Sequence, residues 1–279
     1  MAGKEKPENG KLKVGFYNVT GCAGCLLSVI YTEGDFLEFS QQVDIVSFPF
    51  IKEKNDDEQE LDVAFIEGVV VTKADEETVK KIRERSKMVV ALGACAHLGN
   101  IPALAKMKKS EDLEYLKYKK EDFNMDREGG PAPLHTLIKI DYTLPGCPPD
   151  RDEIRQFMKY LLLGKTFRNY NDPVCVECKL RNNGCLLDQG KICLGPIIAG
   201  GCKAVCPSGG LKCYGCRGFV QGIDKEFDGY FRIMEDKGFS LDDVKRALET
   251  FMAIDAHKVL DEKFAQYQLN RKAREESYE

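Results

Sequence analysis

Through its first 165 residues the chain alternates short apolar runs with longer stretches of helical periodicity. The apolar runs are rich in β-branched and aromatic residues, which predicts buried strands. They cover residues 12–19, 43–50, 62–71, 88–96 and 136–149. Helices are predicted over 24–38, 73–87, 100–108 and 150–164, the last with Asp150 as its N-cap and Gly164 at its end. Strands that alternate with helices predict a doubly wound parallel sheet of the α/β class.

The pattern changes after the last of these helices. From Gly184 to Gly218 the chain holds nine glycines without a clear period, which indicates irregular backbone that buries little apolar surface. Further on, helical periodicity returns, and Ser240 is the expected N-cap of a helix with an acidic first turn. We therefore expect two domains, residues 1–165 and 166–279. Within the first, the charged segment 106–134 is expected to be an exposed insertion, with a partner contact as the alternative.

Composition and charge narrow the classes of function. The chain has 279 residues, of which 43% are hydrophobic, so two domains are expected, with enough apolar residues for a real core. The net charge is −4 and no basic stripe is present, which argues against a nucleic-acid partner. The first ten residues lack the apolar segment of a secretory signal, and no apolar run reaches the length of a membrane span. We expect a cytoplasmic protein without a membrane span.

Twelve cysteines are the most distinctive feature, because a reducing cytoplasm favours metal binding or redox catalysis over structural disulfides. Cys22 and Cys25 follow the first predicted strand, Cys95 the fourth and Cys147 the fifth, while Glu67 lies near the end of the third. The carboxyl ends of parallel strands meet at one edge of a sheet, where open α/β sheets bind ligands. We therefore expect these four thiols and this carboxylate to lie at one edge.

The other eight cysteines crowd into the glycine-rich stretch and its approach: Cys175, Cys178, Cys185, Cys193, Cys202, Cys206, Cys213 and Cys216. A reactive dithiol at Cys22 and Cys25 leaves Cys95 and Cys147 without explanation. Structural zinc would use the thiols in three four-cysteine sites, but zinc usually stabilises small domains. Iron–sulfur clusters fit better, since four thiolates for each [4Fe-4S] cluster make three clusters with none left over. This count alone does not decide between the three chemistries.

Three motifs at the predicted sheet edge resemble the proximal-cluster motifs of [NiFe]-hydrogenase small subunits: GCAGC at 21–25, ALGACA at 91–96 and LPGCPP at 144–149. The eight-cysteine stretch resembles the two-cluster domain of the cytoplasmic branch, above all that of viologen-reducing hydrogenases and archaeal sulfhydrogenases. The resemblance covers roughly residues 12–220 and accounts for all twelve cysteines in order. It implies a flavodoxin-like domain that holds a proximal cluster, followed by an irregular two-cluster iron–sulfur domain with C-terminal helices.

The resemblance also implies which cysteines hold each of three [4Fe-4S] clusters. The ligands would be Cys22, Cys25, Cys95 and Cys147 for the proximal cluster, Cys175, Cys178, Cys185 and Cys193 for the distal one, and Cys202, Cys206, Cys213 and Cys216 for the medial one. A crossed division is the rival, because Cys206-Pro207 resembles the closing Cys-Pro of ferredoxins, which ligates the other cluster. Cys175 and Cys206 stand where membrane-associated relatives have a histidine or lack a cysteine, and this departure favours three four-iron clusters.

Four single residues have two interpretations each. Glu67 resembles a family glutamate near the proximal cluster and the large-subunit interface, where it would handle protons or form interface hydrogen bonds; the alternative is a solvent-facing loop carboxylate. His97, two residues past Cys95, is expected to be an ordinary loop or capping histidine rather than a donor to a cluster sulfur. Arg217 and Lys212 either offset the negative charge of a thiolate-ligated cluster or are surface charges.

The resemblance implies the electron-transfer small subunit of an oxidoreductase that acts on H2. In this family a separate large subunit holds the nickel–iron centre, and the chain has no Asp-Pro-Cys element of the kind that binds it. The implied partners are that large subunit and, as electron acceptor, a further iron–sulfur/flavin subunit or a heterodisulfide reductase. The alternative function is a stand-alone ferredoxin-like carrier. A complex-I-type quinone-module subunit ranks last, since it would carry a tandem Cys-Cys and lack the eight-cysteine stretch.

Overall fold

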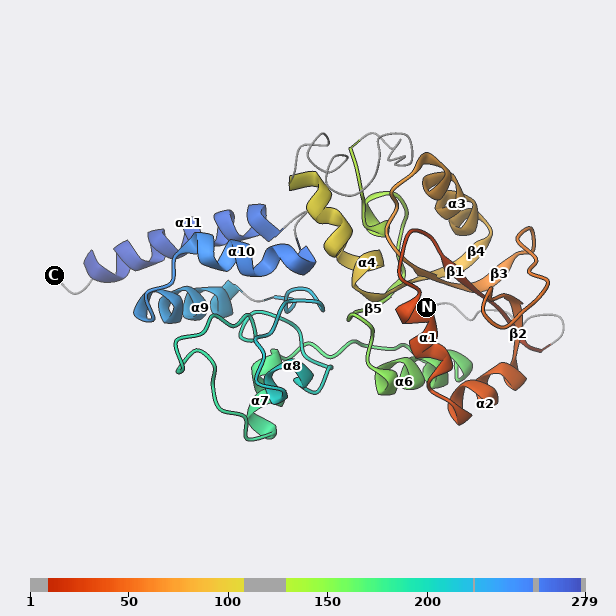
Figure 1. The fold of residues 1–279 in the computed structure, drawn as a ribbon, viewed down its shortest axis with the longest axis horizontal. Coiled ribbons are helices and arrows are strands. Elements are labelled where there is room, and N and C mark those ends of the chain that lie inside the picture. Colours follow the sequence, from red (N-terminus) through yellow and green to blue (C-terminus); the bar gives the residue numbers. More distant parts are fainter. Residues whose placement is uncertain (1–9, 108–128, 223, 253–255, 277–279) are drawn as a thin grey trace. The chain divides into compact units, whose positions relative to one another are not determined.

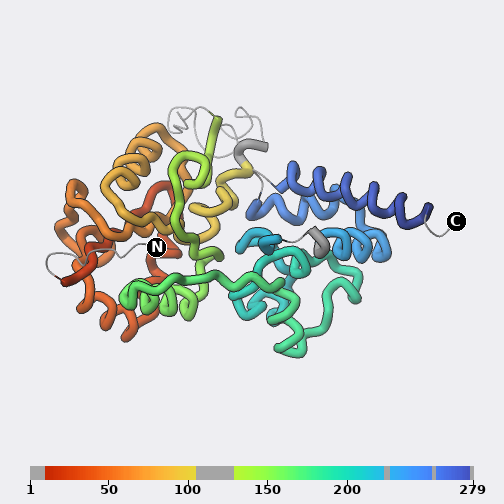
Figure 2. Tube along the Cα trace, turned by 180° about the vertical axis from the view of Figure 1, so that it is seen from behind, coloured from red at the N-terminus to blue at the C-terminus, as the bar shows by residue number. Residues whose placement is uncertain are grey.

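The computed structural model describes residues 10–107, 129–222, 224–252 and 256–276. The chain separates into two units, Met1–Asn169 and Tyr170–Glu279 (Figures 1 and 2). The first unit combines a parallel sheet with helices. The second consists of irregular chain followed by helices.

A five-stranded sheet forms the centre of the first unit. Its strands are β1 Leu12–Asn18, β2 Val43–Ser47, β3 Leu61–Glu67, β4 Ser86–Leu92 and β5 Tyr142–Leu144. They lie in the order β2-β1-β3-β4-β5, and each neighbouring pair is parallel. This is the strand order of flavodoxin-like sheets. The predicted α/β class and parallel sheet are confirmed.

Helices cover both faces of this sheet (Figure 1). One face is covered by α1 Gly24–Ile30, α2 Gly34–Gln42 and α6 Arg151–Leu162, and the other by α3 Lys73–Glu84 and α4 Gly93–Leu98. Two 3-10 helices, η1 Ile101–Met107 and η2 Leu134–Thr136, complete the unit. Because side chains alternate along a strand, Phe65 packs on the first face and Ile66 on the second. The sheet is therefore doubly wound, as predicted.

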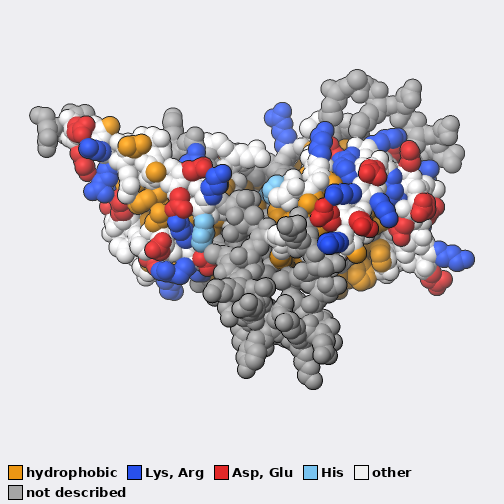
Figure 3. Space-filling view, turned by 90° about the horizontal axis from the view of Figure 1, so that it is seen from above, with side chains coloured by type: hydrophobic (Ala, Val, Ile, Leu, Met, Phe, Trp, Pro, Cys, Tyr) orange, Lys and Arg blue, Asp and Glu red, His pale blue; other side chains and the backbone are white. Residues whose placement is uncertain are grey.

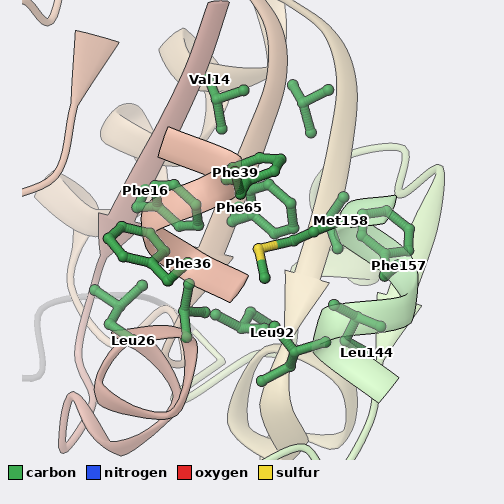
Figure 4. Close-up of a cluster of buried hydrophobic side chains, with 14 of the residues drawn as sticks. Val14, Phe16, Leu26, Phe36, Phe39, Phe65, Leu92, Leu144, Phe157 and Met158 are labelled. Carbon is green, nitrogen blue, oxygen red and sulfur yellow. The ribbon is translucent and has the colours of Figure 1, made fainter. Parts of the chain in front are cut away.

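The larger core cluster packs aromatic residues of the strands against α2 and α6 (Figure 4). Phe16 and Phe65 stack with ring centroids 4.8 Å apart, and Phe157 of α6 meets Phe65 edge-on at 5.7 Å. All three side chains are at most 2% exposed. Since burying one such side chain contributes roughly 1.5–3 kcal/mol, this unit has a core that does not depend on a bound group.

Two predicted helices differ from those observed. The helix expected over 24–38 is two helices, α1 and α2, because Glu33 has a positive φ (φ 54°, ψ −114°) that interrupts the helical backbone between them. The helix expected over 73–87 ends at Glu84, since Ser86 already begins β4. The N-cap predicted at the start of α6 is confirmed: the Asp150 carboxylate accepts the N–H of Asp152 at 3.0 Å.

Most of the segment 106–134, expected to be an exposed insertion, lies outside the described residues. Its last residues are buried, which contradicts the expectation for this part. Ala132 is 2% exposed, and its N–H and carbonyl exchange hydrogen bonds of 2.9 and 3.0 Å with Val70. Leu134 is fully buried in the core on the α3 face. The expectation failed here because these few apolar residues follow a long charged stretch in the sequence.

The second unit begins with irregular chain that carries two short helices, α7 Val174–Leu180 and α8 Val205–Ser208. Three longer helices follow: α9 Asp224–Asp236, α10 Leu241–Met252 and α11 Ala256–Glu276. Phe227 and Phe231 of α9 stack at 5.7 Å in their core. Ser240 caps α10 as predicted: its Oγ accepts the N–H of Asp243 (3.2 Å), and its N–H donates to the Asp243 carboxylate (2.8 Å).

No helix in the described part of the chain is long and apolar enough to cross a membrane. On the face drawn in Figure 3, acidic and basic side chains are interspersed. Ion pairs such as Lys80 with Glu76 (2.6 Å) are exposed and contribute at most about 1 kcal/mol each. The stability of the fold therefore comes mainly from its buried cores.

Candidate metal centres

The register of the sheet aligns the ends of four strands. Asn18 of β1 pairs with Glu67 of β3, Glu67 with Leu92 of β4, and Leu92 with Leu144 of β5. Three of these ends are followed within a few residues by the candidate thiols: Cys22 and Cys25 after β1, Cys95 after β4, and Cys147 after β5. The fourth, the end of β3, is Glu67 itself. The structure thus brings the predicted residues to one edge of the sheet.

Backbone contacts hold the cysteine-bearing loops against each other. The N–H of Ala94 donates to the carbonyl of Gly146 at 2.7 Å, which ties the loop after β4 to the loop after β5. Gly93 has a left-handed conformation (φ 87°), and a Cβ added there would overlap the Sγ of Cys25. Only glycine satisfies both conditions. The turn out of β4 is therefore shaped around the Cys25 sulfur.

The four thiols at this edge interact with one another. Burial is the main cause that raises the pKa of Cys25; further causes are its neighbours Glu67, Cys95, Cys147 and Cys22. Burial likewise raises the pKa of Cys95 to about 11. Cys25 is buried, whereas Cys22 and Cys147 are exposed. Cys25 and Cys95 resist losing their protons alone, and a bound cationic group would displace those protons, as metal ions do.

An amide that the sequence did not identify lies beside two of these thiols. The Nδ2 of Asn100 donates to Cys95 Sγ at 3.1 Å and to Cys147 Sγ at 3.7 Å. These bonds oppose the effect of burial, which nevertheless keeps the pKa of both thiols above the usual value. The available signal was an asparagine after Gly99 at the end of α4, but that position ordinarily indicates a helix terminator. His97 lies half-buried within α4.

Glu67 is 2% exposed, so its interpretation as a solvent-facing loop carboxylate is wrong. Its carboxylate accepts the N–H of Leu26 at 2.6 Å and is also bonded by the N–H groups of Ala23 and Cys25. Burial raises the pKa of Glu67, and these three hydrogen bonds oppose the rise. The residue thus fixes the start of α1 and, with it, the position of Cys25. Proton handling or an interface contact stays a prediction.

The first thiol set of the second unit begins on α7, where Cys175 and Cys178 lie three residues apart and share one side of the helix. Burial raises the pKa of Cys175 to about 12; further causes are Cys193, Cys178 and Cys185. Gly195 approaches this group closely, since an added Cβ would lie 3.1 Å from Cys175 Sγ and 3.6 Å from Cys193 Sγ. The four thiols therefore interact as one set.

Cys213 is at the centre of the other set. Burial raises its pKa well above the usual value, and Cys193, Cys216 and Cys202 raise it further. The N–H of Cys213 donates to Cys193 Sγ at 3.3 Å, so the two sets are adjacent. Cys206 interacts with Cys193, a member of the first set. Whether the medial and distal ligands are sequential or crossed therefore stays a prediction.

Arg217 is 2% exposed, and its Nε donates to the carbonyl of Gly200. Its interpretation as a surface charge is therefore wrong. Burial raises the pKa of Cys202, and the positive charge of Arg217 is among the groups that oppose this rise. Lys212 is half-buried, with its ammonium 5.2 Å from the centre of the Tyr214 ring. Of the two cations, Arg217 is the one whose charge opposes the rise in the pKa of a thiol in these sets.

The donor sets fit iron–sulfur clusters better than single ions. Within the described residues, no three Cys, His, Asp or Glu side chains are placed to hold one metal ion. A [4Fe-4S] cluster spaces its ligands more widely, because each thiolate binds a different iron. N–H donors to the sulfurs, which tune such clusters, come from Asn100, from the backbone of Cys213 at Cys193, and from Asn183 Nδ2 at Cys178 Sγ (3.6 Å).

Comparison with known proteins places this arrangement in a family. The family model described as NADH ubiquinone oxidoreductase, 20 Kd subunit, matches residues 22–161, which include all four thiols of the sheet edge. The sulfhydrogenase 2 subunit delta of Pyrococcus furiosus is 32% identical over 241 residues, 86% of this chain and 99% of that protein. One subunit of the F420-non-reducing hydrogenase vhu of Methanocaldococcus jannaschii is 33% identical over 247 residues, 78% of this chain and 84% of that protein.

Solved structures share the fold. A chain of an NAD+-reducing [NiFe]-hydrogenase matches with a TM-score of 0.50 and 27% identity over 56% of this chain and 93% of its own length. A chain of the Ni-Fe-Se hydrogenase of Desulfomicrobium baculatum matches with a TM-score of 0.54 and 15% identity over 77% and 97%. The fold and the four thiols at the edge of the sheet thus define an oxidoreductase subunit of the 20 Kd family. Within it, the chain belongs to the small subunits of [NiFe]-hydrogenases.

Proposed function

We propose that the chain is the electron-transfer small subunit of a [NiFe]-hydrogenase. It relays electrons between the H2-activating site of a large subunit and a further redox subunit by means of three [4Fe-4S] clusters. The observation that carries the proposal is the convergence of Cys22, Cys25, Cys95 and Cys147 from three strand ends at one sheet edge. Each bound cluster supplies a one-electron carrier whose potential follows burial, charge and hydrogen bonds to sulfur.

The chain's own residues hold and separate the three groups. At the sheet edge, Glu67 fixes the start of α1, and Gly93 leaves room for the Cys25 sulfur. We assign Cys175, Cys178, Cys185 and Cys193 to the distal cluster and Cys202, Cys206, Cys213 and Cys216 to the medial cluster. The bond from Cys213 N–H to Cys193 Sγ supports neighbouring medial and distal sites, as rapid electron exchange requires.

The exposed thiols of the sheet edge support a large-subunit partner. Cys22 and Cys147 face solvent in the isolated chain, while Cys25 is buried. A partner that covers this edge excludes water from the thiolates and from the group that they hold. We infer that this partner is the hydrogenase large subunit and that it carries the nickel–iron centre, because the proposed clusters use all twelve cysteines of this chain.

A second surface supports docking of a further redox subunit. Leu180 on α7 and Val205 on α8 are 78% and 66% exposed. The ends of these helices are joined by the bond from Asn183 Nδ2 to Ser208 Oγ at 3.0 Å. Leu180 lies near the assigned distal thiol Cys178, and Val205 lies next to the assigned medial thiol Cys206. Exposed apolar side chains of this kind suit a partner interface. An iron–sulfur/flavin subunit or a heterodisulfide reductase fills this role. The many free thiols suit a reducing compartment, and we place the protein in the cytoplasm.

Metal content and assembly test the proposal directly. We expect about twelve iron and twelve acid-labile sulfide atoms in each chain, and EPR signals of three clusters after reduction. The chain should copurify with a large subunit in its native complex. A chain that stays alone and monomeric on size exclusion, with its clusters intact, would instead support a stand-alone ferredoxin-like carrier. An iron-free yet active complex would contradict both functions.

The electron route is tested by Cys193→Ala in the assembled complex. We expect the distal cluster to be lost and the reduction of the acceptor to stop, while hydrogen–deuterium exchange at the large subunit continues. Ser240→Ala is the matched control in the same unit, because it removes only a helix cap worth about 1 kcal/mol. Acceptor reduction at full rate in Cys193→Ala would contradict the proposed route.

A further inference from the structure

Asn100 is the one polar side chain in the described structure whose amide donates to thiols from two different strand-end loops. Its Nδ2 lies 3.1 Å from Cys95 Sγ and 3.7 Å from Cys147 Sγ. The residue is 3% exposed. It immediately follows Gly99, which ends α4. Cys95 lies within this helix, so the amide beside the Cys95 sulfur comes from the residue just after the end of the same helix.

Two energetic penalties at Asn100 indicate that this placement is not merely a helix ending. The backbone is left-handed (φ 52°), where glycine is the less strained residue. The Oδ1 is buried and has no hydrogen-bond partner among the described residues, which is rare for a buried polar atom. When the sulfurs are ionised, as in a metal-bound site, the opposite orientation of the amide would point its oxygen at negative charge, so the observed orientation suits thiolates. Native structures accept such penalties mainly at functional sites.

We propose that Asn100 is a positioning residue that raises the reduction potential of the group held by Cys22, Cys25, Cys95 and Cys147. This inference rests on the proposed function. Reduction adds negative charge to the ligating sulfurs, so an N–H donor stabilises the reduced state more than the oxidised one. Since the donor reaches two of the four ligands, its removal makes this group harder to reduce.

A weaker counterpart in the second unit provides a reference point. Asn183 follows Cys178 by five residues, the spacing that separates Asn100 from Cys95, and its Nδ2 lies 3.6 Å from Cys178 Sγ. The same nitrogen donates to Ser208 Oγ at 3.0 Å, so its principal partner is a hydroxyl rather than a sulfur. The shorter and doubly sulfur-bonded amide at the sheet edge is expected to have the larger effect.

The test is an EPR-monitored redox titration of the assembled complex with Asn100→Gly and Asn100→Leu. Glycine suits the left-handed backbone, and leucine retains the approximate shape, so the two variants share only the loss of the donor. At a fixed applied potential we expect about a tenfold lower ratio of reduced to oxidised proximal cluster in both, which is 59 mV for one electron. Asn182→Gly is the control, since it makes the same exchange at another left-handed position (φ 55°) that is exposed.

The outcomes separate this inference from the proposed function. If the parent complex contains about twelve iron atoms per chain and shows the proximal signal, the proposed function stands. Unchanged proximal potentials in either variant that retains the cluster would then overturn the role of Asn100 alone. Loss of the cluster in both variants would also overturn it, because that result assigns Asn100 to cluster retention. A parent chain without iron would remove the proposed function itself.

Discussion

Two regions of this chain gather thiols, and they do so by different means. In the first unit, hydrogen-bonded strands end in register, and short loops carry the cysteines above an aromatic core. In the second unit, eight cysteines lie on two short helices and irregular, glycine-rich chain. A sheet edge can form before its metal group is bound, whereas an irregular segment gains much of its folding energy from the group. The first site is therefore expected to be rigid and the second adaptable.

The largest expected difference between the two regions follows the removal of iron and sulfide. After chelation under oxidising conditions, we expect the amides of residues 174–222 to lose most of their protection against hydrogen exchange, because that segment is irregular chain with only two short helices among its described residues. Amides of β1, β3 and β4 should remain protected, since their core is independent of the clusters. Hydrogen-exchange mass spectrometry measures both regions in one sample. Equal loss of protection in the two regions would show that the sheet also depends on its cluster.

Glycine-to-alanine exchanges next to the thiols should separate the rigid site from the adaptable one. In Gly93→Ala, the new methyl group would overlap Cys25 Sγ, so we expect loss of the proximal cluster and a fall from about twelve to about eight iron atoms. In Gly195→Ala, the methyl group would lie 3.1 Å from Cys175 Sγ, and we expect the loop to move slightly and all iron to be retained.

The control for backbone strain is Gly164→Ala. This glycine is also left-handed (φ 63°), but no atom lies within 4 Å of an added Cβ. Alanine there should cost roughly 1–2 kcal/mol of stability and leave the iron content unchanged. If Gly164→Ala lost as much iron as Gly93→Ala, strain rather than overlap with the sulfur would explain the result.

Substitutions at Glu67 test how strongly the sheet edge depends on one buried carboxylate. Glu67→Ala leaves the N–H groups of Ala23, Cys25 and Leu26 without their acceptor, at about 1–3 kcal/mol for each buried donor. We expect a lower thermal midpoint and partial loss of the proximal cluster. Glu67→Gln keeps one oxygen acceptor and should retain most of the cluster. Iron content and thermal unfolding of the two variants check this order.

If Glu67 also handles protons, the glutamine variant will separate the two roles. A structural acceptor alone predicts that Glu67→Gln keeps both the cluster and the rate of H2 turnover. A proton-handling group predicts an intact cluster with slower turnover. The two results are distinguished by comparing iron content with activity in the same preparation.

The sequence predicted the features that depend on local pattern and on where parallel strands end, and it failed on the burial and partners of individual side chains. The α/β class follows from periodicity, and the N-caps Asp150 and Ser240 follow from residues three positions apart at most. The burial of Glu67 and Arg217 was not predictable, because charged side chains are normally exposed wherever they lie in the sequence pattern. Asn100 was missed for a related reason: its sulfur partners include one that is 47 residues away.

The smallest expected effect concerns the buried cation of the second region. Arg217→Gln removes a positive charge that opposes the rise in the pKa of Cys202. We therefore expect reduction of the cluster held by the Cys202 set to become less favourable by on the order of 1 kcal/mol, which lowers its reduction potential. Lys212→Gln removes a half-buried charge that stacks on Tyr214 and should change that potential much less. Redox titration of both variants tests the difference. Equal shifts would mean that net charge, rather than the burial of Arg217, sets the potential in this region.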